Sequence, residues 1–224
     1  MRKTLILSFL ILILSGLTAQ NPVAPAEKSD PEAKKVLDRV RKKYDNYKSF
    51  EANFSLVIEV PGQPKDTQKG TVGQQGEKFR LDMDPQIIAS DGKTNWIYLK
   101  KNNEIQINDA DPNSDNGFLT PKDLLFRYEK GDFMYAITDK VTEKSRVLTQ
   151  IEFKPKDKKS EYAKLRVSID EKAGTIESIK AFAKDGSRYA FQITRFTPNK
   201  IFGADYFRLD AKSFPGAHVE DLRM

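Results

Sequence analysis

The stretch SDGKTNWIY, residues Ser90 to Tyr98, joins a tight turn to a strand that holds the only tryptophan of the chain. Asp91-Gly92 supplies the turn, because glycine adopts the positive φ that short hairpin connections require. Trp96 and Tyr98 lie two residues apart, so their side chains point to the same face of a sheet. The stretch therefore predicts a hairpin in an antiparallel sheet, and it leaves open which face the two rings occupy.

Alternation of apolar and polar side chains extends this pattern along the chain. From Phe50 to Val60 the even-numbered side chains are apolar and most odd-numbered ones are polar, which is typical of a half-buried strand. Similar or shorter strand patterns occur at 70–73, 78–83, 87–88, 94–100, 104–108, from Phe133 onward, and at 147–153, 163–169, 176–183, 188–197 and 205–210. We expect about nine to eleven strands, joined mainly by short turns.

Two segments show helix signals and would pack on this sheet. The first begins within Ser29–Glu32, which fits both a Ser–Glu capping box and an Asp-Pro start. Apolar residues at helical spacing carry it to about Lys48. The second begins at Thr120-Pro121 and ends at Gly131. The elements predict an antiparallel sheet with two or more helices against it.

The N-terminus has the layout of a secretory signal peptide. A short basic start precedes the apolar run Leu5–Leu14, and small residues follow up to Ala19. The run is too short to span a bilayer comfortably, although an uncleaved anchor is the alternative. We expect residues 1–19 to be the signal peptide, 20–28 a flexible lead-in and 29–224 one domain.

The absence of cysteine and the modest net charge further limit the class of protein to which this chain can belong. Without cysteine the mature chain can be neither disulfide-bonded nor itself lipidated at an N-terminal cysteine, so we expect a soluble periplasmic protein. The net charge of +6 is spread along the sequence except for the cluster Lys154, Lys156, Lys158 and Lys159. That cluster is typical of a solvated hairpin loop, or it could attract anionic lipid headgroups. Export argues against a nucleic-acid partner.

Catalytic and metal-binding patterns are poorly supported. His218 is the single histidine, and no serine lies in a nucleophile-elbow context. Zinc sites use several histidines or cysteines. Asp109-x-Asp111-x-Asn113 resembles the start of a calcium loop, but Ser114 and Thr120 stand where glycine and glutamate are needed. We therefore expect no enzyme, no catalytic residue, no metal and no cofactor.

Five fragments in chain order carry a family resemblance. The fragments are Phe50-Glu51-Ala52-Asn53-Phe54, Phe79 to Met83, Ser90 to Tyr98, Thr120-Pro121-x-x-Leu124-Leu125, and Phe207-x-Leu209 followed by Pro215 to Asp221. Together they resemble the LolA family of periplasmic lipoprotein carriers, and the similarity covers nearly all of the mature chain.

This resemblance implies an α+β, mostly β fold: a curved antiparallel sheet that forms an incomplete (half) β-barrel, lidded by helices. It also implies a monomeric shuttle for acylated lipoproteins. Such a shuttle would receive them from an inner-membrane lipoprotein-releasing ABC transporter and deliver them to an outer-membrane acceptor.

Alternation and the resemblance together predict the residues of an acyl-chain cavity. The predicted lining is Phe54, Leu56, Phe79, Leu81, Trp96 and Tyr98, with Leu124, Leu125 and Phe126 as lid contacts. The sequence departs from the family pattern at one place. Some family members have a basic residue followed by proline just before the cavity strand, whereas this chain has Gln74-Gln75-Gly76 there.

Three other functions fit parts of the sequence. A carrier of other lipids or an envelope-stress sensor would have the same architecture. An envelope hydrolase would need two carboxylates that converge in a polar pocket. A structural protein would have a filled core and no cavity.

Overall fold

The computed structural model describes residues 29–110, 128, 130–143 and 145–223. The predicted signal peptide, the lead-in and most of the second predicted helix, including Leu124, Leu125 and Phe126, lie outside these residues.

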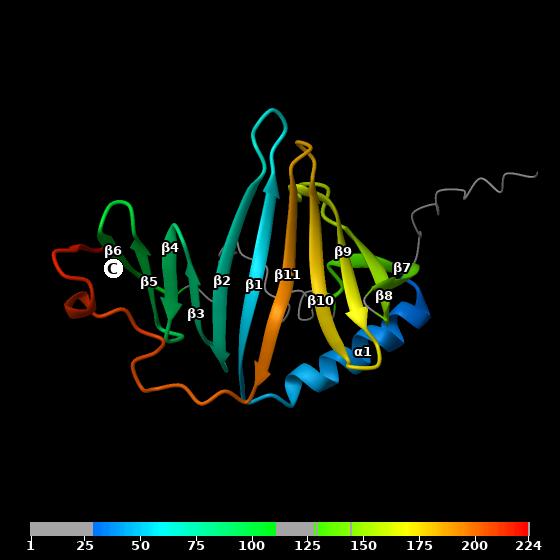
Figure 1. Cartoon of the computed structure of the whole chain (residues 1–224), viewed down its shortest axis with the longest axis horizontal. Helices are drawn as coiled ribbons and strands as arrows, with labels where there is room; N and C mark the ends of the chain where they lie inside the picture. Colours follow the sequence, from blue (N-terminus) through cyan, green and yellow to red (C-terminus); the bar gives the residue numbers. More distant parts are fainter. Residues whose placement is uncertain (1–28, 111–127, 129, 144, 224) are drawn as a thin grey trace, which may run out of the picture.

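The described strands form one open, curved sheet (Figure 1). Their order across the sheet is β12-β6-β5-β4-β3-β2-β1-β11-β10-β9-β8-β7. The strands are β1 (Ser49–Glu59), β2 (Asp66–Gln75), β3 (Lys78–Met83), β4 (Gln86–Ser90), β5 (Thr94–Leu99), β6 (Glu104–Asp109), β7 (Phe133–Glu143), β8 (Arg146–Pro155), β9 (Tyr162–Asp170), β10 (Thr175–Ala183), β11 (Arg188–Pro198) and β12 (His218–Asp221). The predicted fold class, a mostly β open curved sheet, is confirmed.

All neighbouring strands pair antiparallel except β12, which runs parallel to β6. The pairing of β1 with β11 joins two runs of consecutive antiparallel strands, β1 to β6 before the undescribed segment and β7 to β11 after it. Each run is a meander of hairpins, which explains why local turn signals located these strands. β12 adds to the outer edge of the first run.

Helix α1 (Pro31–Asp45) lies against one face of the sheet, below β7–β10 in Figure 1. Asp30 is its N-cap, and the Asp30 carboxylate accepts a hydrogen bond from Glu32 N at 2.8 Å. The helix ends at Asp45, earlier than the predicted Lys48. Its buried side chains are Ala33, Val36, Leu37, Val40 and Tyr44.

The face that contacts α1, called the inner face from here on, carries the main core. Phe54 is opposite Ile193 of β11 and Gly70 of β2, and its ring centroid lies 4.6 Å from that of Phe191. Apolar residues of β7 to β11 complete this core with α1, including Ile151, Phe153, Leu165, Val167 and Ile169.

A second, smaller core lies on the opposite, outer face. It comprises Ile87, Ala89, Trp96, Ile105 and Leu209. Residues 205–210, predicted as a strand, are irregular and lead into the short 3-10 helix η1 (Ala211–Ser213). The prediction of a strand here was wrong. Phe207 and Leu209 are apolar because both are buried, but their segment does not pair with any strand of the sheet.

Candidate functional site

The inner face of β1 to β5 carries a strip of apolar side chains. Leu81 of β3 is in register with Ile88 of β4, and Ile88 is in register with Ile97 of β5. Directly opposite residues of antiparallel strands share a face, so the three side chains form one row. Leu81 is buried, whereas Ile88 and Ile97 are half-buried.

Four of the predicted cavity residues lie on this inner face. Phe54 and Leu81 are each 2% exposed and form its floor. Leu56 and Phe79 are half-buried, and Leu56 packs against the main core. The half-buried side chains present apolar surface that α1 does not cover, since the helix lies over the other half of the sheet (Figure 1).

Trp96 and Tyr98 lie on the outer face, so the structure does not bring them together with Phe54 and Leu81. Ile97, between them in the chain, is the β5 residue in register with the inner-face row. Trp96 is 6% exposed and packs in the outer core. The Tyr98 ring centroid lies 4.1 Å from that of Phe214.

The C-terminal segment 202–217 covers this part of the outer face. Arg80 of β3 donates a hydrogen bond to the Tyr206 carbonyl at 3.2 Å, and its guanidinium carbon lies 5.5 Å from the centroid of the Tyr206 ring. Gly73 permits the close approach, because a Cβ there would lie 2.7 Å from the Tyr206 ring. Burial raises the pKa of the Tyr206 hydroxyl. The segment therefore stabilises the sheet from outside.

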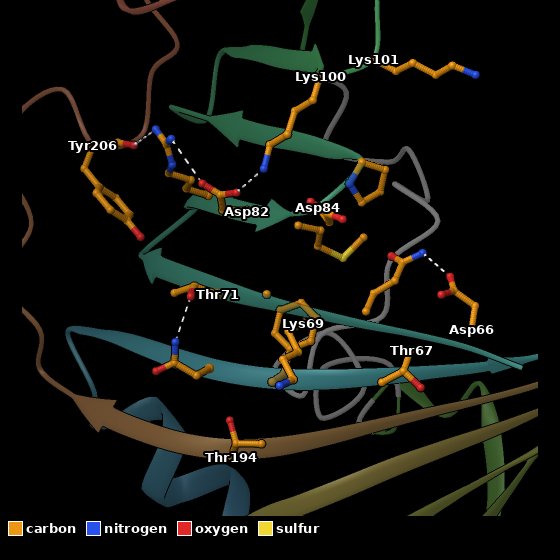
Figure 2. A pocket seen from close by; sticks show the side chains of 17 residues that line it. Asp66, Thr67, Lys69, Thr71, Asp82, Asp84, Lys100, Lys101, Thr194 and Tyr206 are labelled. Carbon is orange, nitrogen blue, oxygen red and sulfur yellow. Dashed lines mark hydrogen bonds and ion pairs between the residues drawn. The ribbon is translucent and has the colours of Figure 1, made fainter.

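A groove of about 1260 Å³ opens where β2 continues past the end of β3. Figure 2 shows its charged lining, in which Asp82 pairs with Lys100 at 3.1 Å and lies 3.8 Å from Arg80. Asp66, Asp84 and Lys101 add further charges. Alternating charges suit solvent better than an acyl chain, so this groove is a poor lipid site.

The sequence reasoning missed Ile88, Ile97 and Ile193, the half-buried inner-face residues that extend the strip. Alternation places them in strands but does not assign their face. Ile97 alternates with Trp96 and Tyr98, so only the strand register assigns it to the inner face.

No set of three or more metal-ligating side chains occurs among the described residues. His218 is exposed on β12, opposite Glu104 of β6. Gln74 and Gln75 end β2, and the exposed Gly76 begins the turn to β3 with a φ of +59°. These three residues put no basic side chain at the position where some family members have one.

An open curved sheet with an apolar strip on its inner face and a helix packed beside it defines a lipid-binding carrier-type fold. The chain belongs to the family described as "Outer membrane lipoprotein carrier protein LolA", which matches residues 45–210. The resemblance drawn from the five fragments is thereby confirmed. None of the described helices is long and apolar enough to cross a membrane.

A solved structure shows the same fold at low sequence identity. This uncharacterized conserved protein from Thermus thermophilus is 14% identical, with a TM-score of 0.55 over 85% of this chain and 99% of that one. A LolA superfamily protein from Nitrosomonas europaea is less similar in structure. It is 12% identical, with a TM-score of 0.41 over 80% of this chain and 98% of that one.

An uncharacterized protein of Methanocaldococcus jannaschii is 29% identical over 105 residues, or 46% of this chain. The chain spans only 28% of that relative's length.

Proposed function

We propose that the protein is a periplasmic carrier that binds the acyl chains of lipoproteins on the inner face of β1 to β5. It then shuttles them from the inner to the outer membrane. The observation that supports this most directly is the half-buried apolar strip beside α1, formed by Leu56, Ile88, Ile97 and Ile193.

The physical task explains why such a strip is needed. An acyl chain of about fifteen methylenes, at about 0.8 kcal/mol each, has on the order of 12 kcal/mol at stake in water. A soluble carrier must cover that surface and later release it. Branched aliphatic side chains offer apolar contact without directional bonds, which suits both requirements.

Within this proposal the predicted residues have separate roles. Leu56 and Phe79 contact the acyl chain, and Phe54 and Leu81 support them from below. Leu124, Leu125 and Phe126 remain predicted lid contacts. Trp96 and Tyr98 hold the outer core.

The proposal also includes the cellular route. Residues 1–19 direct export and are removed, and residues 29–224 form the single carrier domain. The carrier works as a monomer, takes lipoproteins from an inner-membrane lipoprotein-releasing ABC transporter and gives them to an outer-membrane acceptor. No cofactor takes part at the carrier.

Purification from the native periplasm, followed by mass spectrometry of what co-purifies, tests this function. We expect triacylated lipoproteins. Free phospholipid or glycolipid alone would contradict lipoprotein transfer and favour a carrier of other lipids. A variant with Leu56→Asp on the inner face is the control, because the charge should abolish lipid capture.

A further inference from the structure

Three hairpin turns meet at one end of the sheet, the upper end in Figure 1. They join β1 to β2, β8 to β9 and β10 to β11. Lys184 Nζ donates a hydrogen bond to the Lys158 carbonyl at 2.6 Å, and Lys184 N donates one to the Glu161 carbonyl at 2.9 Å. A Cβ at Gly186 would lie only 3.2 Å from Pro61 Cγ. The three turns therefore form one surface. This surface, called the hairpin end from here on, comprises residues 60–65, 154–161 and 184–187.

The hairpin end carries lysines that pair with no carboxylate. Four exposed lysines lie in and beside the turn between β8 and β9, and none of them forms an ion pair with another described residue. They are Lys154, Lys156, Lys158 and Lys159. The aspartate of this turn, Asp157, accepts a hydrogen bond from Lys159 N at 2.8 Å and so shapes the turn. By contrast, Lys164 and Arg166 further along β9 both pair with Glu152. The unpaired ammonium groups give the hairpin end a positive surface.

The part of the inner face that α1 leaves uncovered leads to the same end. Leu56 and Ile58 of β1 are half-buried there, and Ile58 lies opposite the half-buried Tyr189 of β11, close to where both strands reach the hairpin end. Helix α1 packs at the other end of the sheet (Figure 1), where Tyr44 Oη accepts a hydrogen bond from Ile176 N at 3.4 Å. An acyl chain on the inner face can therefore leave toward the hairpin end without crossing α1.

We infer that the hairpin end docks on the surface of an anionic lipid bilayer. Each lysine near such a surface raises the affinity by about fivefold. An acidic protein is a weaker fit, because lysine is depleted in protein–protein interfaces. A bilayer is also where acyl chains enter and leave water. The inference adds a membrane-docking surface to the proposed function, and only this last argument rests on that function.

Co-sedimentation of the protein with vesicles tests the inference. One set of vesicles contains equal parts of phosphatidylglycerol and phosphatidylcholine, and the other contains phosphatidylcholine alone. At low ionic strength we expect at least about tenfold stronger binding to the anionic vesicles. Added salt should weaken this binding, because it screens charges at an exposed surface.

Two variants that lose the same net charge show whether the hairpin end is responsible. The first removes its four unpaired lysines and should bind anionic vesicles at least about tenfold more weakly than the wild type. Its substitutions are Lys154→Gln, Lys156→Gln, Lys158→Gln and Lys159→Gln. The matched control removes four exposed lysines from β3 to β6 and the C-terminal segment, which also form no ion pair with described residues. Its substitutions are Lys78→Gln, Lys93→Gln, Lys101→Gln and Lys212→Gln.

The control variant should keep most of the binding to anionic vesicles. Because all eight lysines are exposed, both variants should melt close to the temperature of the wild type, so lost binding would not reflect unfolding. Equal losses in the two variants would overturn the inference, since net charge alone would then explain the binding.

The remaining outcomes also decide the matter. Equal binding of the wild type to both sets of vesicles, or binding that salt does not weaken, would overturn the inference. Failure to bind either set would overturn it as well and leave an acidic protein as the partner of these lysines. The vesicles contain no lipoprotein, so the inference can fail while lipoprotein capture from the periplasm succeeds, and the reverse.

Discussion

Gly70 lies on the inner face at a position where an added side chain has no room. A Cβ there would lie 2.6 Å from both the Asp82 carbonyl oxygen and Phe54 Cζ. The aromatic ring of Phe54 therefore lies over the β2 backbone only because Gly70 has no side chain.

We expect Gly70→Ala to destabilise the fold by about 1–3 kcal/mol, because the ring or the strand must shift. Urea unfolding would measure the difference. Gly203→Ala is the matched control, since a Cβ at Gly203 meets nothing within 4 Å. Equal stability of the two variants would contradict the packing argument.

Phe79 and Trp96 are aromatic residues on opposite faces, and their alanine variants should separate binding from folding. Phe79 is half-buried on the inner face, so Phe79→Ala should weaken lipopeptide binding about tenfold with little loss of stability. Trp96 is buried in the outer core, so Trp96→Ala should cost about 3–5 kcal/mol of stability.

Titration with a lipopeptide and urea unfolding of each variant provide the two measurements. Leu81→Ala should also weaken binding, but at a greater cost in stability because Leu81 is buried. If neither Phe79→Ala nor Leu81→Ala reduces binding, the inner-face assignment is wrong.

At the scale of elements, the start of α1 shows how one side chain links a helix to the sheet. Besides Glu32 N, the Asp30 carboxylate accepts a hydrogen bond from Ile137 N of β7 at 3.3 Å. Asp30 N donates to the Tyr135 carbonyl at 2.8 Å. The cap thus sets both where the helix begins and where it docks.

Asp30→Ala should lower the free energy of unfolding by about 1–2 kcal/mol, as for other N-caps. Thermal and urea unfolding would detect this loss. Ser29→Ala is the control, because Ser29 belongs to the alternative capping box, which the structure does not use. A larger effect at Ser29 would reverse the assignment of the cap.

The hairpin of β8 and β9 has a pH-dependent contact on its outer face. Burial would raise the pKa of Glu152, but hydrogen bonds from Lys164 and Arg166 outweigh it and lower the pKa from its ordinary 4.5. The folded-state pKa is therefore below the unfolded one. The stability it contributes is present above about pH 4.5 and is lost as pH falls through the folded-state pKa.

Glu152→Gln should cost at most about 1 kcal/mol at pH 7, because the pair is partly exposed to solvent. The difference from wild type should shrink as the pH falls below 4.5, as the carboxyl becomes protonated in the folded protein as well. Urea unfolding at pH 7 and at a series of lower pH values would show it, with the exposed Glu161→Gln as control. A difference that grows in acid would contradict the sign of the pKa shift.

At the scale of the whole molecule, the single tryptophan lies on the face of the sheet opposite to the proposed lipid site. Trp96 lies beneath the C-terminal segment, and the guanidinium carbon of Arg208 lies 5.6 Å from the centroid of its ring. Lipid bound on the inner face would not touch it.

We therefore expect lipopeptide binding to leave Trp96 fluorescence and its acrylamide quenching nearly unchanged. The double variant Trp96→Phe, Ile97→Trp moves the reporter by one residue to the inner face, and there binding should reduce quenching. A large response from Trp96 with none from the moved reporter would place the lipid on the outer face.

The sequence alone was sufficient to locate β1 to β11, the N-terminal helix and the family, because alternation, turn residues and capping residues are local signals. It did not locate β12, and it presented residues 205–210 as a strand. Alternation reports burial on one side of a strand, and turn residues such as Asp91-Gly92 report local backbone geometry. Both patterns can be recognised in the sequence without knowledge of the rest of the fold.

Only the tertiary structure decided which face each strand presents to which partner. A shift of one residue in strand register moves every side chain to the opposite face. The alternating pattern alone therefore does not decide whether Ile97 or Trp96 lies on the inner face. The covering segments, α1 inside and residues 202–217 outside, come from opposite ends of the described chain. Their packing placed Trp96 and Tyr98 outside, Leu56 and Phe79 inside, and Phe207 and Leu209 in an irregular segment that the sequence pattern presented as a strand.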